Sequence, residues 1–111
     1  MNVKLIPSEE FLRRLKHLAK KYKSIGDDYR TLKESLLKNP FLGESLGSGV
    51  RKIRMAIGSK GKGKSGGARV LTLVVLVSGD ADVTLLTIYD KEEIDNVSDN
   101  YIKWLVSEVK I

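Results

Sequence analysis

Apolar positions near the N-terminus predict a short strand followed by an amphipathic helix. Residues 3–5 alternate as Val-Lys-Leu, and Pro7 closes this strand-like piece. Ser8 is a residue type preferred at helix N-caps, and Glu9 and Glu10 suit the positive end of a helix. Apolar side chains then recur at helical spacing: Phe11, Leu12, Leu15, Leu18, Ala19 and Tyr22.

A second helix is expected directly after the first. Gly26 interrupts the first helix, Asp27 can cap another, and the Asn39-Pro40 pair ends it. The apolar stripe of this second helix is Tyr29, Leu32, Leu36 and Leu37. We therefore expect the two helices to form a hairpin laid over a sheet.

From Val50 onward the apolar period changes to two, which predicts a strand. Ile53 and Met55 face one side of this strand, and the cationic side chains of Lys52 and Arg54 face the other. One face of the strand is therefore expected to join the core while the other carries positive charge.

The second half of the chain predicts two more strands and a final helix. Residues 68–77 are rich in β-branched side chains and apolar on both faces, as expected of a central strand. Residues 78–81 indicate a turn and residues 83–89 another strand. Ser98 can cap the last helix, whose apolar positions are Tyr101, Ile102, Leu105, Val106 and Val109. The expected order is β-α-α-β-β-β-α, an α+β fold with a mainly antiparallel sheet.

Length and composition bound the class of protein. A chain of 111 residues is expected to form one domain over residues 1–111, with enough buried surface for its own core. It has no cysteine, so neither disulfides nor thiolate metal sites are expected. No apolar run reaches the ~18 residues of a membrane span, and the N-terminus lacks the pattern of a signal peptide. We expect a soluble cytoplasmic protein with no membrane partner.

Positive charge is concentrated in one part of the chain. The net charge is +6, and seven basic residues lie within positions 51–69, where there is no Asp or Glu. These are Arg51, Lys52, Arg54, Lys60, Lys62, Lys64 and Arg69. Such a concentrated positive field is expected to attract a polyanion such as RNA, although a solvated lysine-rich loop is the plainer interpretation.

The glycine-rich loop also fits a nucleotide-binding pattern by chance. Residues 58–65, Gly-Ser-Lys-Gly-Lys-Gly-Lys-Ser, match the Walker A form G-x-x-x-x-G-K-[ST]. A Walker A loop needs a helix immediately afterwards, because the helix N-terminus surrounds the phosphates. Here Gly66-Gly67 and a β-branched run follow, which favour a strand. We therefore expect a hairpin connection and no nucleotide cofactor.

Strand pairing brings several candidate site residues together. If both hairpin turns are symmetric, Arg69 lies opposite Asp90 and near Ala56, and Arg54 lies near Leu71, with a register error of about two residues. Neighbouring strands are roughly 4.8 Å apart. Arg54, Arg69 and Lys91 are then expected to meet at one end of the sheet, with Tyr89 on the same face as Lys91. Arg69 could equally serve as an ion-pair partner of Asp90.

Several motifs resemble a known family. The stretches GKGKSGGARVLTLVV and VTLLTIYDKEEIDNVS, with Arg51-Lys52-Ile53-Arg54 upstream, resemble RelE/ParE-superfamily toxins of bacterial toxin–antitoxin pairs, and most closely the HigB-like members. The resemblance covers roughly residues 50–109. It implies a small α+β domain that enters the ribosomal A site, cleaves mRNA and is held inactive by a cognate antitoxin. No metal or organic cofactor is implied.

The same resemblance implies roles for individual residues. Arg69 falls at the position of the arginine that contacts the scissile phosphate, and Lys91 at the position of a basic residue after the following strand. Arg69 would stabilise the phosphorane, and Lys91 would donate a proton or act as a second electrostatic clamp, because crowding by cations eases proton loss from a lysine. Tyr89 would stack on a base or donate a hydrogen bond. The expected RNA-binding residues are Arg51, Lys52, Arg54, Lys60, Lys62 and Lys64.

Departures from the family pattern keep other functions open. Relatives often carry aromatic residues where this chain has Met55 and residues 71–73, and RelE itself has a tyrosine near Ser98, so base stacking is expected to be weaker here. The alternatives are a ParE-type inhibitor of DNA gyrase and a non-catalytic RNA-binding module. Asp90, Glu92, Glu93 and Asp95 form an acidic cluster, but adjacent Glu92 and Glu93 are interpreted as solvated, and no metal site is expected there. Trp104 is expected in the core or facing the antitoxin.

Overall fold

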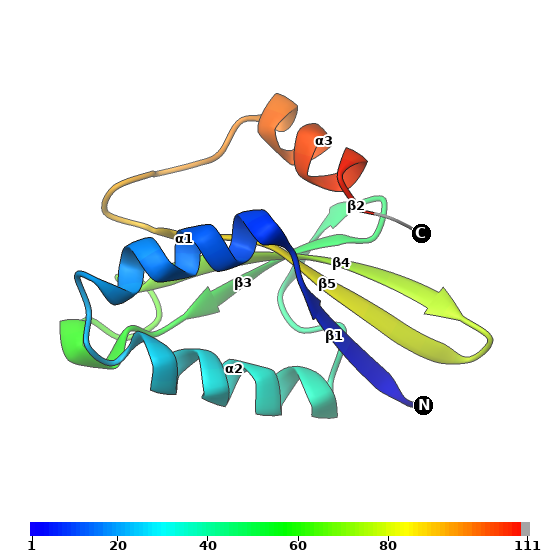
Figure 1. The fold of residues 1–111 in the computed structure, drawn as a ribbon, viewed down its shortest axis with the longest axis horizontal. Helices are drawn as coiled ribbons and strands as arrows, with labels where there is room; N and C mark the ends of the chain where they lie inside the picture. The colour runs from blue at the N-terminus through cyan, green and yellow to red at the C-terminus, as the bar shows by residue number, and fades with distance from the viewer. Residues whose placement is uncertain (110–111) are drawn as a thin grey trace.

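The computed structural model describes residues 1–109, which form three helices, five strands and one short 3₁₀ helix (Figure 1). In chain order these are β1 (Val3–Pro7), α1 (Glu9–Ala19), α2 (Ile25–Lys38), β2 (Glu44–Gly47), β3 (Val50–Met55), η1 (Gly58–Lys60), β4 (Ala68–Val77), β5 (Asp80–Asp90) and α3 (Asp99–Ser107). The predicted α+β class is confirmed. One strand, β2, was not predicted.

The five strands form one sheet in the order β1-β5-β4-β3-β2. β1 runs parallel to β5, and the other three pairs are antiparallel. The central strand is β4, as its apolar residues on both faces predict. β2 lies at an edge with all four residues exposed, so it has no apolar alternation that could have identified it. Its turn places Gly47, Ser48 and Gly49 at positive φ.

Local capping explains where two of the helices begin. The hydroxyl of Ser8 accepts a hydrogen bond from the backbone N–H of Phe11 at 3.0 Å, and that of Ser98 accepts one from Tyr101 at 3.1 Å. Both caps match the sequence prediction. The predicted start of α2 is wrong, because Ser24 holds the N-cap position, and Gly26 and Asp27 lie in the first turn. Burial of Ile25 against the core starts the helix earlier.

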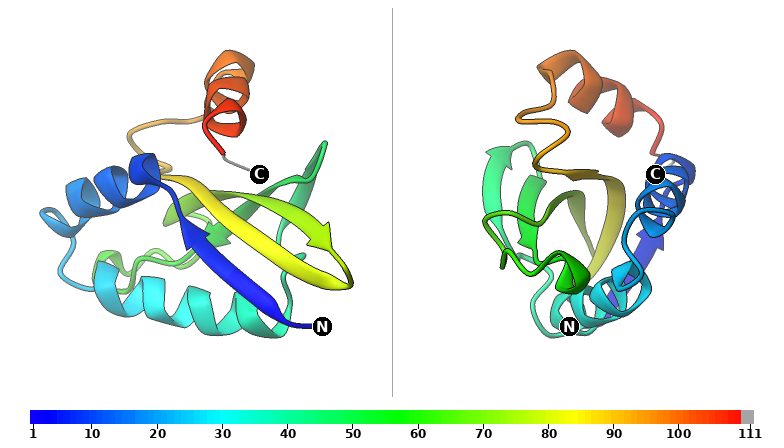
Figure 2. Two further views of the ribbon diagram at one scale, coloured as in Figure 1. Left: turned by 45° about the vertical axis from the view of Figure 1, so that its right-hand side comes forward. Right: turned by 90° about the vertical axis from the view of Figure 1, so that its left-hand side faces the viewer.

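The helices cover opposite faces of the sheet (Figure 2). α1 and α2 pack on one face, where Phe11, Leu18 and Leu36 join inward residues of β3, β4 and β5 such as Ile53, Val70 and Ile88. α3 lies over the other face, where Leu105 packs with a second cluster that includes Val50, Leu71, Leu73, Leu86 and Tyr89. The sheet is therefore a middle layer, and its α3 face carries the side chains of opposite parity to the main core.

Polar contacts attach α3 to the rest of the fold. The hydroxyl of Tyr101 donates to Glu10 of α1 at 2.6 Å and lies 2.9 Å from the hydroxyl of Thr87 on β5. Burial raises the pKa of Tyr101, and the hydrogen bond to Glu10 raises it further. Trp104 stacks on Tyr101 but remains 45% exposed, so its expected place in the core is wrong. Leu12 and Leu37, expected in apolar stripes, are also exposed.

Candidate nucleic-acid interface

Arg54, Arg69 and Tyr89 form a row across three neighbouring strands on the α3 face of the sheet. Arg54 of β3 pairs with Arg69 of β4, and Arg69 pairs with Tyr89 of β5. Directly paired residues of antiparallel strands point to the same face. We call these three residues the sheet row. It brings two guanidinium groups and a phenol to one end of the sheet.

The sheet row differs from the predicted register by one and two residues. Asp90 was expected opposite Arg69 but pairs with Ala68, and Leu71 was expected opposite Arg54 but pairs with Lys52. For β3 and β4 the reason is that β3 ends at Met55 and β4 begins at Ala68, so the connection is longer on its N-terminal side than a symmetric Gly58–Gly67 loop. For β4 and β5 the turn is shorter than residues 78–81, and a bulge lies between Leu71 and Thr72. Tyr89 takes the place in the row where Lys91 was expected.

Gly67 explains why the connection returns so closely to the sheet. A Cβ atom at this residue would lie 2.2 Å from the carbonyl oxygen of Met55. Only glycine allows that approach of two backbones. The strand that was predicted after Gly66-Gly67 is present as β4, and no helix begins within residues 61–98. The Walker A-like loop therefore lacks the following helix that holds phosphates in nucleotide-binding loops.

Arg69 is almost buried, and backbone carbonyls hold its guanidinium. Its side chain donates from Nη1 to the carbonyls of Lys64 at 3.0 Å and Ala68 at 3.1 Å, and from Nη2 to the carbonyl of Ser65 at 3.0 Å. Its residue exposure is 5%. Arg69 forms no ion pair with Asp90, which was its alternative predicted partner. Three of the five N–H groups are thus used within residues 1–109, which leaves donors for another acceptor.

Some of the remaining predicted cations make no ion pair, and the others are held by carbonyls or carboxylates of the fold. Lys52, Arg54 and Lys64 make no ion pair with any carboxylate in the part of the chain that the structure describes. Arg51 is used structurally, since its guanidinium donates to the carbonyls of Leu42 at 3.2 Å and Gly43 at 2.8 Å. The uncompensated charge therefore lies on β3 and in the glycine-rich connection.

Lys60 and Lys62 both face carboxylates after β5. Lys60 is nearly buried and lies 2.7 Å from Asp90, whereas Lys62 is exposed and lies 2.8 Å from Glu92. Burial alone lowers the pKa of Lys60, but hydrogen bonds and charge attraction from Asp90 and Glu92 prevail and raise it. Lys60 was expected on an exposed basic surface, and its burial contradicts that placement.

Lys91 has an acidic neighbour. Its ammonium donates to the Asp95 carboxylate at 2.6 Å and to the Asp95 carbonyl at 3.0 Å. That hydrogen bond, with the charge attraction of Lys91, holds the pKa of Asp95 below its usual range. The expectation that other cations crowd Lys91 is therefore not met, because its nearest charged group is a carboxylate.

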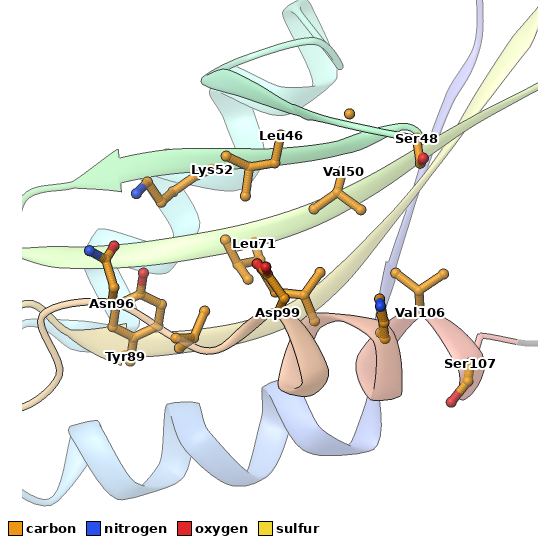
Figure 3. A pocket seen from close by; sticks show the side chains of 14 residues that line it. Leu46, Ser48, Val50, Lys52, Leu71, Tyr89, Asn96, Asp99, Val106 and Ser107 are labelled. Carbon is orange, nitrogen blue, oxygen red and sulfur yellow. The ribbon is translucent and has the colours of Figure 1, made fainter.

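A groove of about 740 Å³ lies beside the sheet row, between the β2–β3 hairpin and α3 (Figure 3). Its lining is mostly apolar and includes Leu46, Val50, Leu71, Ile102 and Val106. Lys52, Tyr89 and Asn96 lie together at one end, as Figure 3 shows. Burial raises the pKa of Tyr89, although the charge of Arg69 opposes this, so its phenol is protonated at neutral pH and can donate.

Sequence reasoning missed several groups near this site. Asn96 belongs to a segment without periodic pattern, and nothing in the sequence placed it beside Tyr89. The contact of Tyr22 with Asp90, at 2.5 Å between hydroxyl and carboxylate, joins residues 68 positions apart. Within residues 1–109, no group of three or more His, Cys, Asp or Glu side chains is placed to hold a metal ion. No helix in that range is long and apolar enough to cross a membrane.

Comparison with known proteins identifies the fold. No family model matches the sequence. Among solved structures, the chain is similar to the free state of a double arginine-to-alanine mutant of the E. coli toxin RelE. The TM-score is 0.59 at 17% sequence identity, and the match covers 99% of this chain and 100% of that chain. The chain thus has a RelE-like fold over nearly its whole length.

Proposed function

We propose that this chain is the toxin of a type II toxin–antitoxin pair, related to the RelE/ParE superfamily and within it to HigB-like members. Its activity would be cleavage of mRNA on the ribosome, in the cytoplasm, without a metal or organic cofactor. The observation that carries the proposal is the sheet row, which sets Arg54, Arg69 and Tyr89 side by side on a RelE-like fold. An antitoxin with an acidic segment would neutralise the basic surface.

The proposed chemistry needs positive charge near one phosphate. The ribose 2′-oxygen attacks the adjacent phosphorus, the bond to the 5′-oxygen breaks, and a cyclic phosphate and a 5′-hydroxyl remain. Negative charge grows on the phosphorane oxygens during this step. A fixed guanidinium such as that of Arg69 therefore stabilises the transition state more than the ground state.

The other groups would position the RNA and move protons. Tyr89, protonated at neutral pH, would donate a hydrogen bond at the end of the groove; its 1% exposure leaves no ring face for the base stacking that was also expected. Lys91 would supply a proton to the leaving oxygen or act as a second clamp, and this role requires RNA to displace its contact with Asp95. Lys52, Arg54 and Lys64 would bind phosphates along the strand. Arg51, Lys60 and Lys62 would contribute through the long-range field.

The proposal predicts that growth arrest depends on Arg69. Induction of the wild-type chain without its antitoxin should stop translation and growth, and Arg69→Ala should restore growth because the transition-state charge loses its partner. Arg30→Ala is the matched control, since Arg30 is an exposed arginine on α2 whose one ion pair within residues 1–109 is with Asp27. Equal toxicity of the Arg69→Ala and wild-type chains at equal soluble levels would refute the site.

A further inference from the structure

Two buried charges fasten the glycine-rich connection to the end of β5. The ammonium of Lys60 lies 2.7 Å from Oδ1 of Asp90, and the two side chains are 7% and 1% exposed. The same ammonium donates to the carbonyl of Gly66 at 2.8 Å. Asp90 also accepts from the hydroxyl of Tyr22 at 2.5 Å and from the backbone N–H of Glu92 at 2.9 Å. Asp90 is thus held in place from several sides.

The carbonyls that orient Arg69 belong to the segment that Lys60 holds. Lys64 and Ser65 accept from Nη1 and Nη2 of Arg69, and Gly66 is the next residue along the chain. The carbonyl of Gly67 in turn accepts from the backbone N–H of Lys91 at 3.1 Å. Contacts therefore run from Asp90 through Lys60 to the carbonyl of Gly66, and the peptide chain links Gly66 to Ser65, whose carbonyl accepts from the guanidinium of Arg69.

The start of the connection is fixed independently of this pair. The Asp28 carboxylate of α2 accepts from the backbone N–H of Gly58 at 3.0 and 3.2 Å. The hydroxyl of Ser24 accepts from the backbone N–H of Ser59 at 2.8 Å. Loss of the Lys60 ammonium would therefore remove the hydrogen bond at the Gly66 carbonyl, while η1 stays attached to α2 and the exposed Lys62–Glu92 pair remains. Burying an ion pair is a poor way to gain stability, because desolvation offsets the attraction between the charges.

We propose that Lys60 and Asp90 are positioning residues, which fix the guanidinium of Arg69 by holding the backbone carbonyls of residues 64–66. The inference rests on the proposed function for the role of Arg69 in catalysis. Neither Lys60 nor Asp90 touches the RNA in this proposal. Their effect reaches the reaction only through the orientation of Arg69.

The double variant Lys60→Met/Asp90→Asn tests this role with little risk to folding. Both charges are removed together, so no uncompensated charge stays buried. With mRNA on translating ribosomes as substrate, we expect kcat to fall roughly tenfold to a hundredfold and KM to change little, as for a catalytic group that is displaced. In an Arg69→Ala background the same double change should cause no further loss of kcat. Lys60 and Asp90 act only through the Arg69 guanidinium, which is already absent there.

A second readout does not depend on activity. In the wild-type chain the three hydrogen bonds restrict rotation of the Arg69 guanidinium, so NMR should resolve separate Nη–H signals, which the double variant should broaden or merge. Lys21→Met is the control, since Lys21 also pairs with a carboxylate after β5 but contacts no carbonyl of the connection. It should leave both kcat and the Arg69 signals unchanged.

The outcomes separate this inference from the proposed function. Unchanged Arg69 signals in the double variant, or a further loss of kcat in the Arg69→Ala background, would overturn the positioning role. If the wild-type chain cleaves no RNA, the proposed function fails. The positioning role is then decided by the Arg69 signals, which either broaden in the double variant and support it or stay unchanged and refute it.

Discussion

At the scale of single residues, Arg69 is a cation whose guanidinium is fixed within the fold. It is held by the carbonyls of Lys64, Ser65 and Ala68, so little reorganisation would be needed in the proposed contact with a phosphate. Preorganised donors in a site with little water stabilise transition-state charge far better than mobile surface groups do. Arg54, its neighbour in the sheet row, is exposed and suits a looser contact with the RNA backbone.

The lowered pKa of Asp90 predicts that the stability of the fold depends on pH. Burial alone would raise the pKa of its carboxyl, but hydrogen bonds from Lys60, Tyr22 and the backbone of Glu92 lower it below the unfolded value. A lowered folded pKa contributes stability that is present above the unfolded pKa of about 3.9 and is lost as pH falls through the folded value. The free energy of unfolding should therefore decrease in acid.

Urea unfolding of the wild type and Asp90→Asn checks this expectation. At pH 7 the variant should lose up to about 3 to 5 kcal/mol, because the ammonium of Lys60 loses its buried partner and keeps only the half-exposed Glu92 at 3.3 Å. As the pH falls through the lowered pKa of Asp90, the two chains should converge, since protonation progressively neutralises the carboxyl in the wild type as well. A difference that stays constant down to the lowest measurable pH would contradict the role assigned to Asp90.

At the scale of elements, the connection between β3 and β4 depends on glycine where two backbones meet. The Gly66-Gly67 pair lies between the carbonyls that hold Arg69 and the first residue of β4, and Gly67 passes directly against Met55. A side chain there would push the start of β4 away from β3 and disturb the sheet row. By contrast, Gly26 lies in the first turn of α2 with open space around its Cβ position.

Alanine at these two glycines should have opposite effects. Gly67→Ala should lower stability by about 1 to 3 kcal/mol, as overpacking does. Gly26→Ala should raise it by about 0.5 kcal/mol, because alanine has the higher helix propensity and loses less entropy on folding. Thermal unfolding of the two variants beside the wild type measures both shifts. Equal melting temperatures for all three would show that the close approach at Gly67 is not tight.

The elements also show what the sequence could and could not predict. β4, α1 and α3 were predictable because β-branched runs, serine caps and helical periodicity act locally. β2 was missed because four exposed residues at an edge carry no periodic signal. The strand register was off by up to two residues, because it depends on where β3 ends, and a flexible Gly/Lys loop does not mark that end.

For the site, residue types were predictable but their partners were not. Arg54, Arg69 and Lys91 were expected to meet, with Tyr89 on the face of Lys91; the structure puts Arg54, Arg69 and Tyr89 in one row, and Lys91 pairs with Asp95. The burial of Lys60 by Asp90, and the pairing of Lys91 with Asp95, depend on how residues 58–67 and 91–97 fold back. The Lys60–Asp90 contact joins residues 30 positions apart, whereas Lys91 and Asp95 are neighbours in a segment without regular period. Neither charge counts nor alternation predicts such contacts.

At the scale of the whole molecule, the two faces of the sheet differ in the helices that cover them and in the charge they carry. α1 and α2 bury the main core on one face. The other face carries the sheet row, Lys52 and the groove beside α3. The uncompensated cations lie in the β3–β4 region, so a polyanion would approach from one direction. Under the proposed function, RNA would meet the sheet-row end of this second face, where Arg54 is the exposed member of the row and α3 packs beside it on a second apolar cluster.

The most direct measurement is a map of 5′-hydroxyl RNA ends in translating cells after induction of the chain. We predict new ends within translated reading frames, and their loss when translation initiation is blocked or when Arg69→Ala replaces the wild type. Intact mRNA accompanied by DNA damage would contradict the account and indicate a gyrase target. Ends that appear equally in untranslated RNA would contradict the dependence on the ribosome.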